Sequence, residues 1–379
     1  MIPYGRQHIT SEDIEAVVAV LKSDFLTQGP KVKEFEESVA KYCDAKYAVA
    51  FSSGTAALHG AYSAAGIGKG DEVITTPLTF VATANMVLAV GAKPIFADID
   101  SMTGNLDSKK AEGKITKKTK AIVVVDYAGL PADLEAFKKI CKKRKLVFIE
   151  DAAHALGASY GKRKIGSIAD MTMFSFHPVK SITTGEGGVI VTNSKKYFEK
   201  LVLFRSHGIT KDKKNLLHKN REAWYHEMHN LGFNYRITDI QAALGISQMR
   251  KLDVFIEKRK AIAMRYHEAL GNIKRFILPK EISGRKSSWH LYVIRIVPEE
   301  KHLRDIIFGK LHEAGIGAQV HYLPVYHHPY YRSLGYKKGL CPNAEIFSAT
   351  AISIPIFPEL SLAEQGEIIQ HVKRISPNI

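Results

Sequence analysis

The sequence predicts an α/β protein with a largely parallel central sheet sandwiched by helices, plus a smaller C-terminal α+β domain. From residue 48 to residue 150, short β-rich runs alternate with helical patterns, which is typical of a parallel sheet covered on both faces. A long helical tract then spans residues 237–270 and changes direction near Leu252. Because such a tract commonly joins a large domain to a small one, we expect domains at residues 1–250 and 251–379.

The composition is that of an ordinary globular protein that can bury a substantial core. Of the 379 residues, 45% are hydrophobic and 24% are charged. No apolar run approaches the ~18 residues of a membrane span, and residues 1–18 lack the basic and apolar order of a secretory signal. Three widely spaced cysteines, Cys43, Cys141 and Cys341, suggest neither a disulfide framework nor a zinc site. We therefore expect a cytoplasmic protein with no membrane partner.

The charge is strongly basic, with 54 Lys and Arg against 38 Asp and Glu and a net charge of +16. Nucleic-acid binding is one interpretation of this excess. The lysines, however, are scattered through helical segments such as residues 138–145, without the interleaved aromatic residues of a nucleic-acid surface. We expect no nucleic-acid partner, and a basic surface also attracts small anionic ligands. Solvated helix faces account for most of the excess.

The first elements are two helices with a loop between them. Residues 10–22 form an amphipathic pattern, with Thr10 three residues before Asp13 as in a capping box and apolar residues from Ile14 to Leu21 on one face. Pro30 suits the first turn of a second helix over residues 30–43.

A short strand at residues 48–51 is followed by a Ser/Gly turn and a helix over residues 56–66. The free N–H groups and the dipole at such a helix start favour an anion. On these residues alone, an ordinary capped helix is the favoured interpretation.

The alternation continues to residue 151. Strands are predicted at 70–77, 92–100, 121–129 and 145–151, and helices at 78–91 and 131–144, while residues 106–119 form a weak helix at best. Ligands on parallel sheets bind beyond the carboxyl ends of the strands, and Asp151 lies at one of those ends.

The stretch from Ile149 to Gly188 is central to the function. One strand ends in Glu150 and Asp151, and a second run, residues 171–176, leads into Lys180 and a polar Ser/Thr/Gly loop. A lysine delivered into a cleft and an acid that keeps a pyridine nitrogen protonated are what pyridoxal phosphate (PLP) chemistry needs. Taken singly, Lys180 also fits a solvated surface charge and Asp151 a helix cap.

The remaining segments fit a linker and the smaller domain. A helix is predicted at 195–204, a polar and aromatic excursion at 211–230, strands at 288–297 and 316–322, and helices at 300–315, 342–351 and 361–375. The sixteen histidines show no ligand spacing, and the His327–His328 pair lies in a Pro-flanked loop, so we expect no metal.

Several motifs carry a resemblance to a known family: SSGTAAL, TPLTFVATANMVL, EDAAHALG, FSFHPVKSITTGEGG, RSHG and NYRITDIQAALG. Together they resemble the nucleotide-sugar aminotransferases of the DegT/DnrJ/EryC/StrS family, over residues from Tyr4 to about Phe357. The resemblance implies a PLP-dependent enzyme of fold type I, with a fold like that of aspartate aminotransferase. It also implies a homodimer with shared active sites.

The resemblance assigns cofactor roles to specific residues. Lys180 is implied to bind PLP covalently and then to move a proton as general acid and base, and Asp151 to hold the pyridine nitrogen. The other implied cofactor contacts are Thr55 and Ala56 at the phosphate, Phe80 stacked on the ring, His154 at the ring or its 3′ oxygen, Ser175 at the phosphate, and Asn234 reaching the partner's cofactor. From the residues alone, Phe80 also fits a core position and His154 a helix surface.

Substrate contacts are implied along four parts of the chain. These are Tyr4, the loop Asp24, Phe25, Leu26 and Thr27, the segment Gln319, Val320, His321 and Tyr322, and the residues Ser53, Ser175 and Asn234. Arg236 is suited to binding a substrate carboxylate with both guanidinium arms.

Within the family, residues 76–86, 124–143 and 318–326 are most similar to the members that aminate a UDP-linked 2-acetamido-4-keto-2,6-dideoxy hexose at C4, with L-glutamate as amino donor. The alternative is a C4 or C3 aminotransferase of another nucleotide-linked keto sugar, and Pro178 and the excursion at 211–230 bear on that choice. The family's sugar dehydratases carry histidine in place of the lysine, so Lys180 argues against them. A non-catalytic regulator is expected to carry a DNA-binding domain.

Overall fold

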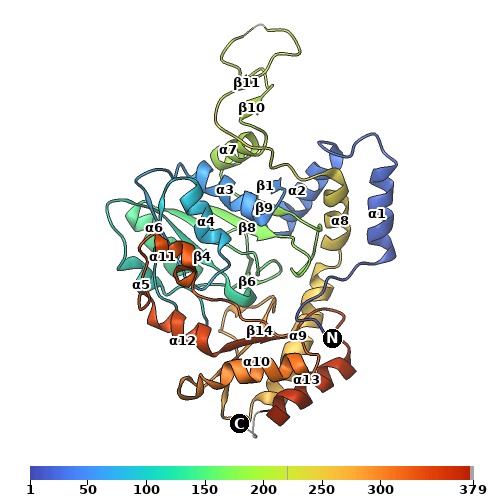
Figure 1. Ribbon diagram of the computed structural model, residues 1–379. Coiled ribbons are helices and arrows are strands. Elements are labelled where there is room, and N and C mark those ends of the chain that lie inside the picture. The colour runs from blue at the N-terminus through green and yellow to red at the C-terminus, as the bar shows by residue number, and fades with distance from the viewer. Residues whose placement is uncertain (220, 376–379) are drawn as a thin grey trace.

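The computed structural model describes residues 1–219 and 221–375, and its centre is a seven-stranded sheet (Figure 1). The strand order is β1 (Tyr47–Phe51), β9 (Gly188–Thr192), β8 (Met171–Ser175), β5 (Val147–Asp151), β4 (Thr119–Val125), β2 (Glu72–Thr75) and β3 (Lys93–Phe96). All neighbouring pairs are parallel except those that β9 makes with β1 and β8. The expectation of a largely parallel sheet is confirmed.

Helices cover both faces of this sheet because the strands are apolar on both sides. In β4, Ile122 and Val124 belong to one core cluster, while Ala121 and Val123 belong to the other. The first face packs against α2 (Pro30–Tyr42), α6 (Leu134–Arg144) and α8 (Asp239–Met249), and the second against α3 (Gly54–Ala64), α4 (Ala82–Ala89) and α7 (Lys195–Arg205). Because successive side chains point to opposite faces and both faces are covered, these strands carry buried apolar residues on both sides.

The helix α1 (Ser11–Leu21) forms as expected but buries a different side. The predicted capping box of Thr10 and Asp13 is present. The predicted apolar face is largely open to solvent, because Ile14, Val18 and Leu21 are exposed while Asp13 and Val20 are buried. Asp13 is held against the body of the protein by Gln248, at 2.8 Å. A polar contact, not the apolar stripe, therefore docks this helix within the single chain.

The C-terminal part has its own sheet and core. Its strands are β12 (Phe276–Ile277), β14 (Tyr292–Ile296) and β15 (Ala351–Ile354), packed against α9 (Leu252–Leu270), α10 (Leu303–Glu313) and α13 (Leu362–Ile375). Shorter elements complete the chain: α5 (Ser108–Glu112), α11 (Pro329–Ser333) and α12 (Pro342–Thr350), with 3-10 turns at Tyr127–Gly129, Pro298–Glu300 and Val325–His327.

The strand expected at residues 316–322 is wrong, and its place beside β14 is taken by β15. The segment makes only isolated bridges, from Ile316 to Ile2 and from Gln319 to Ser353. The chain then leaves the sheet edge, which brings His321 and Tyr322 to a pocket described below.

The expected division at residue 250 stays a prediction, and contacts cross it. Ile2 belongs to the C-terminal core cluster. The strand β6 (Ser159–Tyr160) pairs with β13 (Arg285–Lys286) on one side and β7 (Arg163–Lys164) on the other. The first residues of the chain therefore pack with the last third of it.

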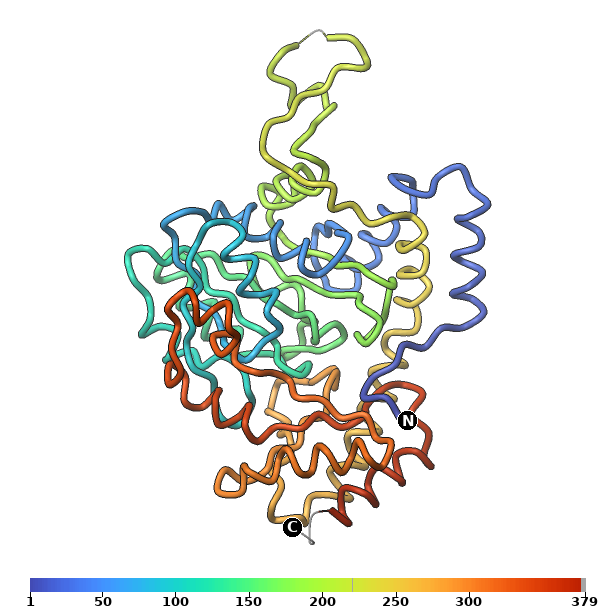
Figure 2. Tube along the Cα trace, in the orientation of Figure 1, coloured from blue at the N-terminus to red at the C-terminus, as the bar shows by residue number. Residues whose placement is uncertain are grey.

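The excursion expected at residues 211–230 projects from the body as a long loop (Figures 1 and 2). Its base is a short hairpin of β10 (Ile209–Thr210) and β11 (Glu227–Met228). Within residues 1–219 and 221–375, no helix combines the length and the apolar character needed to span a bilayer.

Candidate active site

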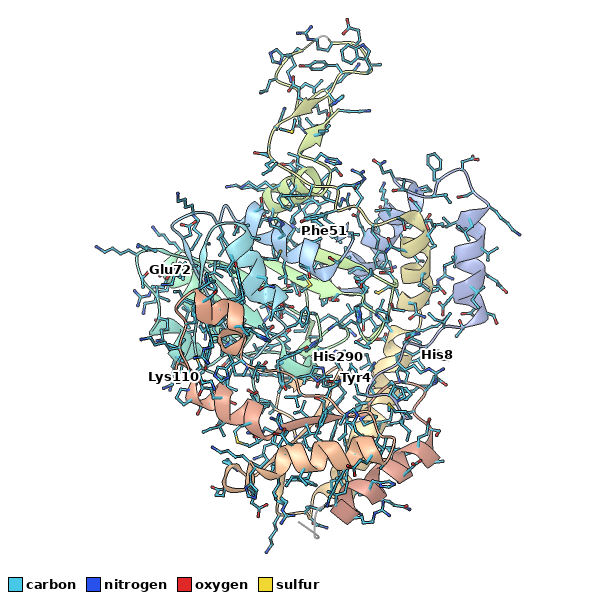
Figure 3. The ribbon with its side chains drawn as sticks, viewed as in Figure 1. Tyr4, His8, Phe51, Glu72, Lys110 and His290 are labelled. Carbon is cyan, nitrogen blue, oxygen red and sulfur yellow. The ribbon has the colours of Figure 1, made fainter. Side chains whose placement is uncertain are left out.

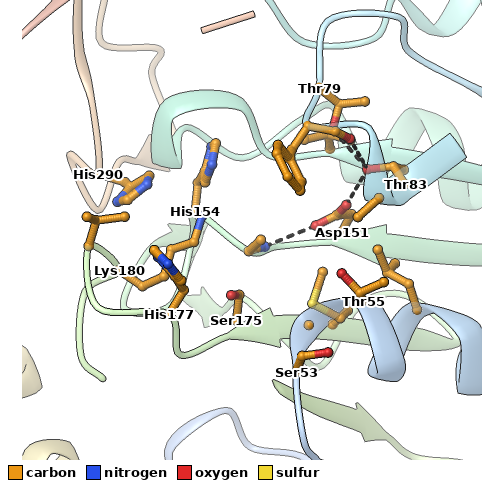
Figure 4. Close-up of a pocket in the computed structure, with 18 of the residues that line it drawn as sticks. Ser53, Thr55, Thr79, Thr83, Asp151, His154, Ser175, His177, Lys180 and His290 are labelled. Atoms are coloured by element: carbon orange, nitrogen blue, oxygen red, sulfur yellow. Dashed lines mark hydrogen bonds between the residues drawn. The ribbon is translucent and has the colours of Figure 1, made fainter. Parts of the chain in front are cut away.

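A pocket opens at the carboxyl ends of the central strands, where Val125 of β4, Asp151 of β5 and Ser175 of β8 line it (Figure 4). Its cavity volume is about 510 Å³, within the range of small-molecule sites. The predicted site residues that line it are Tyr4, Ser53, Thr55, Phe80, Asp151, His154, Ser175, Lys180, His321 and Tyr322. Strand ends, the start of α3 and the segment 321–322 thus converge on one cavity.

Asp151 is buried and held by two donors. Its Oδ2 accepts a hydrogen bond of 2.7 Å from Oγ1 of Thr83, and its Oδ1 accepts one of 3.2 Å from the N–H of Ala153. Burial raises the pKa of Asp151, while these two bonds and the positive charge of Lys180 oppose the rise. A buried carboxylate of this kind is stabilised by any cation placed before it.

Lys180 lies in the turn after β8, where its N–H donates to the carbonyl of His177 at 2.9 Å. Among the described residues its Nζ has no hydrogen-bond or ion-pair partner. Burial lowers the pKa of Lys180 to about 8, and the charge of Asp151 acts in the opposite direction. A substantial fraction of the amine is therefore neutral near pH 8 and able to act as a nucleophile or base.

The N-terminus of α3 forms one end of the pocket. Ser53 caps the helix by accepting a hydrogen bond from the N–H of Ala56 at 3.1 Å. A Cβ on Gly54 would lie 3.2 Å from Cβ of Ser175, and one on Gly188 would lie 2.4 Å from the carbonyl oxygen of Ser53. These glycines let β8, β9 and the start of α3 approach closely. N–H groups and hydroxyls are therefore gathered at one end of the pocket, in an arrangement suited to an anion.

Two histidine rings line the pocket side by side. His154 and His290 are both buried, with ring centroids 4.4 Å apart. Nε2 of His154 lies 3.1 Å from Oη of Tyr322, whereas Nδ1 of His154 is buried without a partner among the described residues. Burial lowers the pKa of both histidines well below the ordinary value. Both rings are therefore neutral at pH 7.

The mouth of the pocket is aromatic. Tyr4 lies with its ring 5.5 Å from that of His321, whose Nδ1 is 2.8 Å from Oγ of Ser353. Burial lowers the pKa of His321 to about 4. Phe80 is 61% exposed at the opposite side, with its ring 6.4 Å from that of Tyr322. An apolar ring left open to a pocket suits stacking on a flat ligand.

The other predicted site residues lie outside this cavity's lining. Ala56 is buried beneath it, and the N–H of that residue already donates to Ser53. Gln319 is exposed beside Val320. The loop Asp24–Thr27 is exposed and is tied to the start of α8 by a bridge from Thr27 to Thr238. Exposed Asn234 and half-buried Arg236 precede that same helix.

Among the pocket residues that the site prediction did not include, five carry polar side chains: Thr79, Thr83, His177, Glu186 and His290. Thr83 lies one turn after Phe80 in a motif already singled out, so spacing offered a signal for it. His290 comes from the strand region of the C-terminal part, and Figure 3 labels it close to Tyr4 near the junction of the two parts. Nothing in its local sequence indicates a site.

The residues present fit PLP. An unpartnered lysine and a buried acid with a raised pKa face one cavity, which suits an aldehyde and a pyridinium nitrogen respectively. The start of α3 offers an anion site for a phosphate, and Phe80 offers an exposed ring face.

The fold and this pocket define an enzyme of the sugar aminotransferase class. The family model described as the DegT/DnrJ/EryC1/StrS aminotransferase family matches residues 7–373. The chain belongs to that family, whose members are PLP-dependent. The predicted family and the fold-type-I architecture are confirmed.

Three similar proteins illustrate the relationship. The UDP-4-amino-4,6-dideoxy-N-acetyl-beta-L-altrosamine transaminase of Campylobacter jejuni subsp. jejuni serotype O:23/36 is 43% identical over 96% of this chain and 94% of its own. The structure of Helicobacter pylori PseC, an aminotransferase of pseudoaminic acid biosynthesis, matches with a TM-score of 0.93 at 37% identity and covers 100% of both chains. The PLP form of the putative sugar aminotransferase Spr1654 from Streptococcus pneumoniae matches with a TM-score of 0.91 at 32% identity, over 99% of this chain and 98% of that one.

Proposed function

We propose that this chain binds PLP and transfers the amino group of L-glutamate to C4 of a UDP-linked 2-acetamido-4-keto-2,6-dideoxy hexose. The observation that carries the proposal is the pairing, in one cavity, of the unpartnered amine of Lys180 with the buried carboxylate of Asp151. The 43% identical transaminase from Campylobacter jejuni supports the choice of sugar.

Each residue has a role that follows from its position. The start of α3, with Ser53 and Thr55, is suited to the phosphate of the cofactor, and Phe80 to the ring face. Asp151, kept in place by Thr83, is suited to the positive pyridine nitrogen. When bound, PLP supplies a carbonyl that takes up amino groups and a ring that accepts electron density.

Proton transfer falls to Lys180. At pH 8 about half of its amine is neutral, so it can accept a proton from the carbon that bears the donor's amino group and return one during the reverse half of the cycle. The three neutral histidines around it, His154, His290 and His321, do not compete as cations. The pocket therefore concentrates acid–base work on one side chain.

The sugar nucleotide is proposed to enter at the aromatic mouth formed by Tyr4, His321 and Tyr322. Lysine and arginine exceed acidic residues by enough to give a net charge of +16, which favours the approach of a diphosphate. Arg236 has no hydrogen-bond or ion-pair partner among the described residues, which leaves it free to bind the carboxylate of glutamate.

A second copy of the chain is proposed to complete the site. The loop Asp24–Thr27, Asn234 and Arg236 lie together at the start of α8 and outside the pocket of their own chain. Beside them, Ile14, Val18 and Leu21 of α1 and the loop residues Phe25 and Leu26 expose apolar side chains. Such a patch is characteristic of a surface that another protein covers, and a homodimer would bring these residues to the partner's pocket.

The experiment that tests the function is product analysis by NMR with a panel of UDP-, GDP- and dTDP-linked 4-keto sugars plus L-glutamate. The expected result is a 4-amino product from the UDP-linked 2-acetamido sugar together with 2-oxoglutarate. Efficient amination of a different nucleotide sugar would replace the proposed substrate and keep the reaction. Turnover of none of them, by protein shown to carry PLP, would overturn the function.

A further inference from the structure

A groove separate from the pocket of Lys180 lies between the C-terminal sheet and the loops beyond β3 and β4. Its lining includes the aromatic residues Tyr127, Trp289 and Phe347 and the polar residues Thr103 and Lys280. Its cavity volume is about 40 Å³, against about 510 Å³ for the pocket of Lys180. We call it the Arg295 groove, after the arginine of β14 that lines it.

Arg295 is a buried cation without an anionic partner. Only 8% of the residue is exposed, and its guanidinium carbon lies 4.5 Å from the ring centroid of Phe347. Across the described ranges, 1–219 and 221–375, its guanidinium forms no hydrogen bond and no ion pair. Asp100 is close enough to act on it electrostatically, but Oδ1 of Asp100 is engaged by the backbone and hydroxyl of Thr103.

A guanidinium stays charged in proteins, and buried charges are normally paired. The contact with Phe347 offsets part of the desolvation cost, but it leaves the in-plane N–H donors of Arg295 unused. Those donors are arranged for a planar, two-oxygen acceptor. The groove therefore presents a guanidinium whose donors suit an anion.

The size of the groove selects the anion. A water molecule needs roughly 10–15 Å³ of such volume, so about 40 Å³ accommodates about three small atoms. A carboxylate group has three heavy atoms and is planar, whereas a phosphate has five and is tetrahedral. The aromatic residues and the lysine of the lining suit a carboxylate attached to a short apolar body.

We propose that the Arg295 groove binds a small carboxylate anion through the guanidinium of Arg295, at a site distinct from the pocket of Lys180. Two contacts connect the sites. Oη of Tyr127 donates to the carbonyl oxygen of His321, and Trp289 directly precedes His290. The two sites thus share a wall. If a ligand in the groove changes the affinity of the pocket, a ligand in the pocket is expected to change the affinity of the groove by the same factor.

The test uses the fluorescence of Trp289. The chain has two tryptophans, Trp224 in the projecting excursion and Trp289 in the groove, so the Trp224→Phe variant reports on the groove alone. PLP-loaded Trp224→Phe protein is titrated with acetate, inorganic phosphate and chloride at constant ionic strength. The expected result is a saturable change with acetate, a weaker one with phosphate and none with chloride.

The decisive variant adds Arg295→Met, which keeps an unbranched apolar stem and removes the charged guanidinium. The acetate midpoint is expected to rise by about tenfold or more, the size of one lost charge-assisted contact. Arg265→Met, which removes an exposed arginine, is the matched control and should leave the midpoint unchanged. An unchanged midpoint in Arg295→Met, or an equal response to chloride, would overturn the proposal.

Two further measurements separate binding in the groove from loss of folding and from binding in the pocket. If Arg295→Met fails to fold, Arg295→Lys retains the charge without the planar fork and should still weaken acetate binding measurably. The response should also persist in a Lys180→Ala background, because that change alters the pocket and not the groove. A response abolished by Lys180→Ala would place the acetate in the pocket and contradict the proposal.

Discussion

Oγ1 of Thr83 donates a 2.7 Å hydrogen bond to the buried Oδ2 of Asp151, and so the start of α4 fixes the carboxylate at the end of β5. Thr83→Val keeps the shape of the side chain and removes this bond. Hydrogen bonds to charged groups are worth about 1.5–3 kcal/mol, so we expect PLP affinity to fall by roughly tenfold to 100-fold. Equilibrium titration of apoprotein with PLP measures it.

The control for this change is Thr192→Val. Thr192 is also buried, and it donates to the carbonyl of Asp170 at the opposite end of β9 from the pocket. That variant should lose stability without losing PLP affinity. Equal affinity losses in the two variants would show that Thr83 matters only for folding.

Lys180→Ala should remove turnover and the visible absorbance band of lysine-bound PLP. Among the described residues, Lys180 is the only lysine that lines the cavity. No neighbouring amine can therefore replace it. Lys162→Ala, on an exposed turn, is the matched control and should behave as the parent protein. Normal transamination by Lys180→Ala would remove that residue from the reaction.

The pH dependence of PLP uptake should report the lowered pKa of Lys180. Only the neutral amine reacts with an aldehyde, so the rate at which apoprotein takes up PLP should rise with pH, level off above about 8, and fall about tenfold per unit below it. Because the charge of Asp151 raises the pKa of Lys180, Asp151→Asn should move the midpoint to lower pH. Stopped-flow absorbance at a series of pH values measures both, and a midpoint near 10.5 contradicts the buried environment of the amine.

Gly188→Ala should damage the proposed phosphate end of the pocket. The added Cβ would lie 2.4 Å from the carbonyl oxygen of Ser53 and 2.7 Å from the backbone nitrogen of Gly54, so the start of α3 must move. We expect lower thermal stability and weaker PLP binding. Gly309→Ala, in α10 with nothing within 4 Å of the new Cβ, should be neutral or gain about 0.5–1 kcal/mol of stability.

Subunit complementation tests the composite site. Asn234→Ala and Lys180→Ala proteins, each inactive or impaired alone, should regain activity when mixed, because one site of the mixed dimer collects both changes and the other neither. The recovered activity is expected to approach about a quarter of the parent level after random exchange, by simple mixing statistics for one intact site in half of the dimers. No recovery, under conditions where labelled subunits are seen to exchange, would mean that each site is built from one chain.

Much of the fold follows from local sequence patterns. The alternation of β-rich runs and helical patterns between residues 48 and 150 predicted the parallel sheet, and the helix cap of Thr10 with Asp13 formed as expected. Asp151 and Lys180 were identifiable because Asp151 ends one predicted strand and Lys180 lies in the loop after another, and parallel strands end at one edge of the sheet. Period and position along the chain were sufficient for these predictions.

Tertiary structure decided the rest, because those features depend on contacts between distant segments. Ile14, Val18 and Leu21 share an apolar helix face that is exposed in the single chain, whereas Asp13 is buried and accepts a hydrogen bond from the distant Gln248. His290 lies 110 positions beyond Lys180 in the sequence. It reaches the pocket only because the C-terminal part packs at the carboxyl ends of the strands of the central sheet. Arg295 likewise reads as one basic residue within an apolar strand. Arg295 is buried without a counter-ion because Phe347 and Tyr127 pack around it. The partners of a side chain are set by the assembled fold and not by its neighbours in sequence.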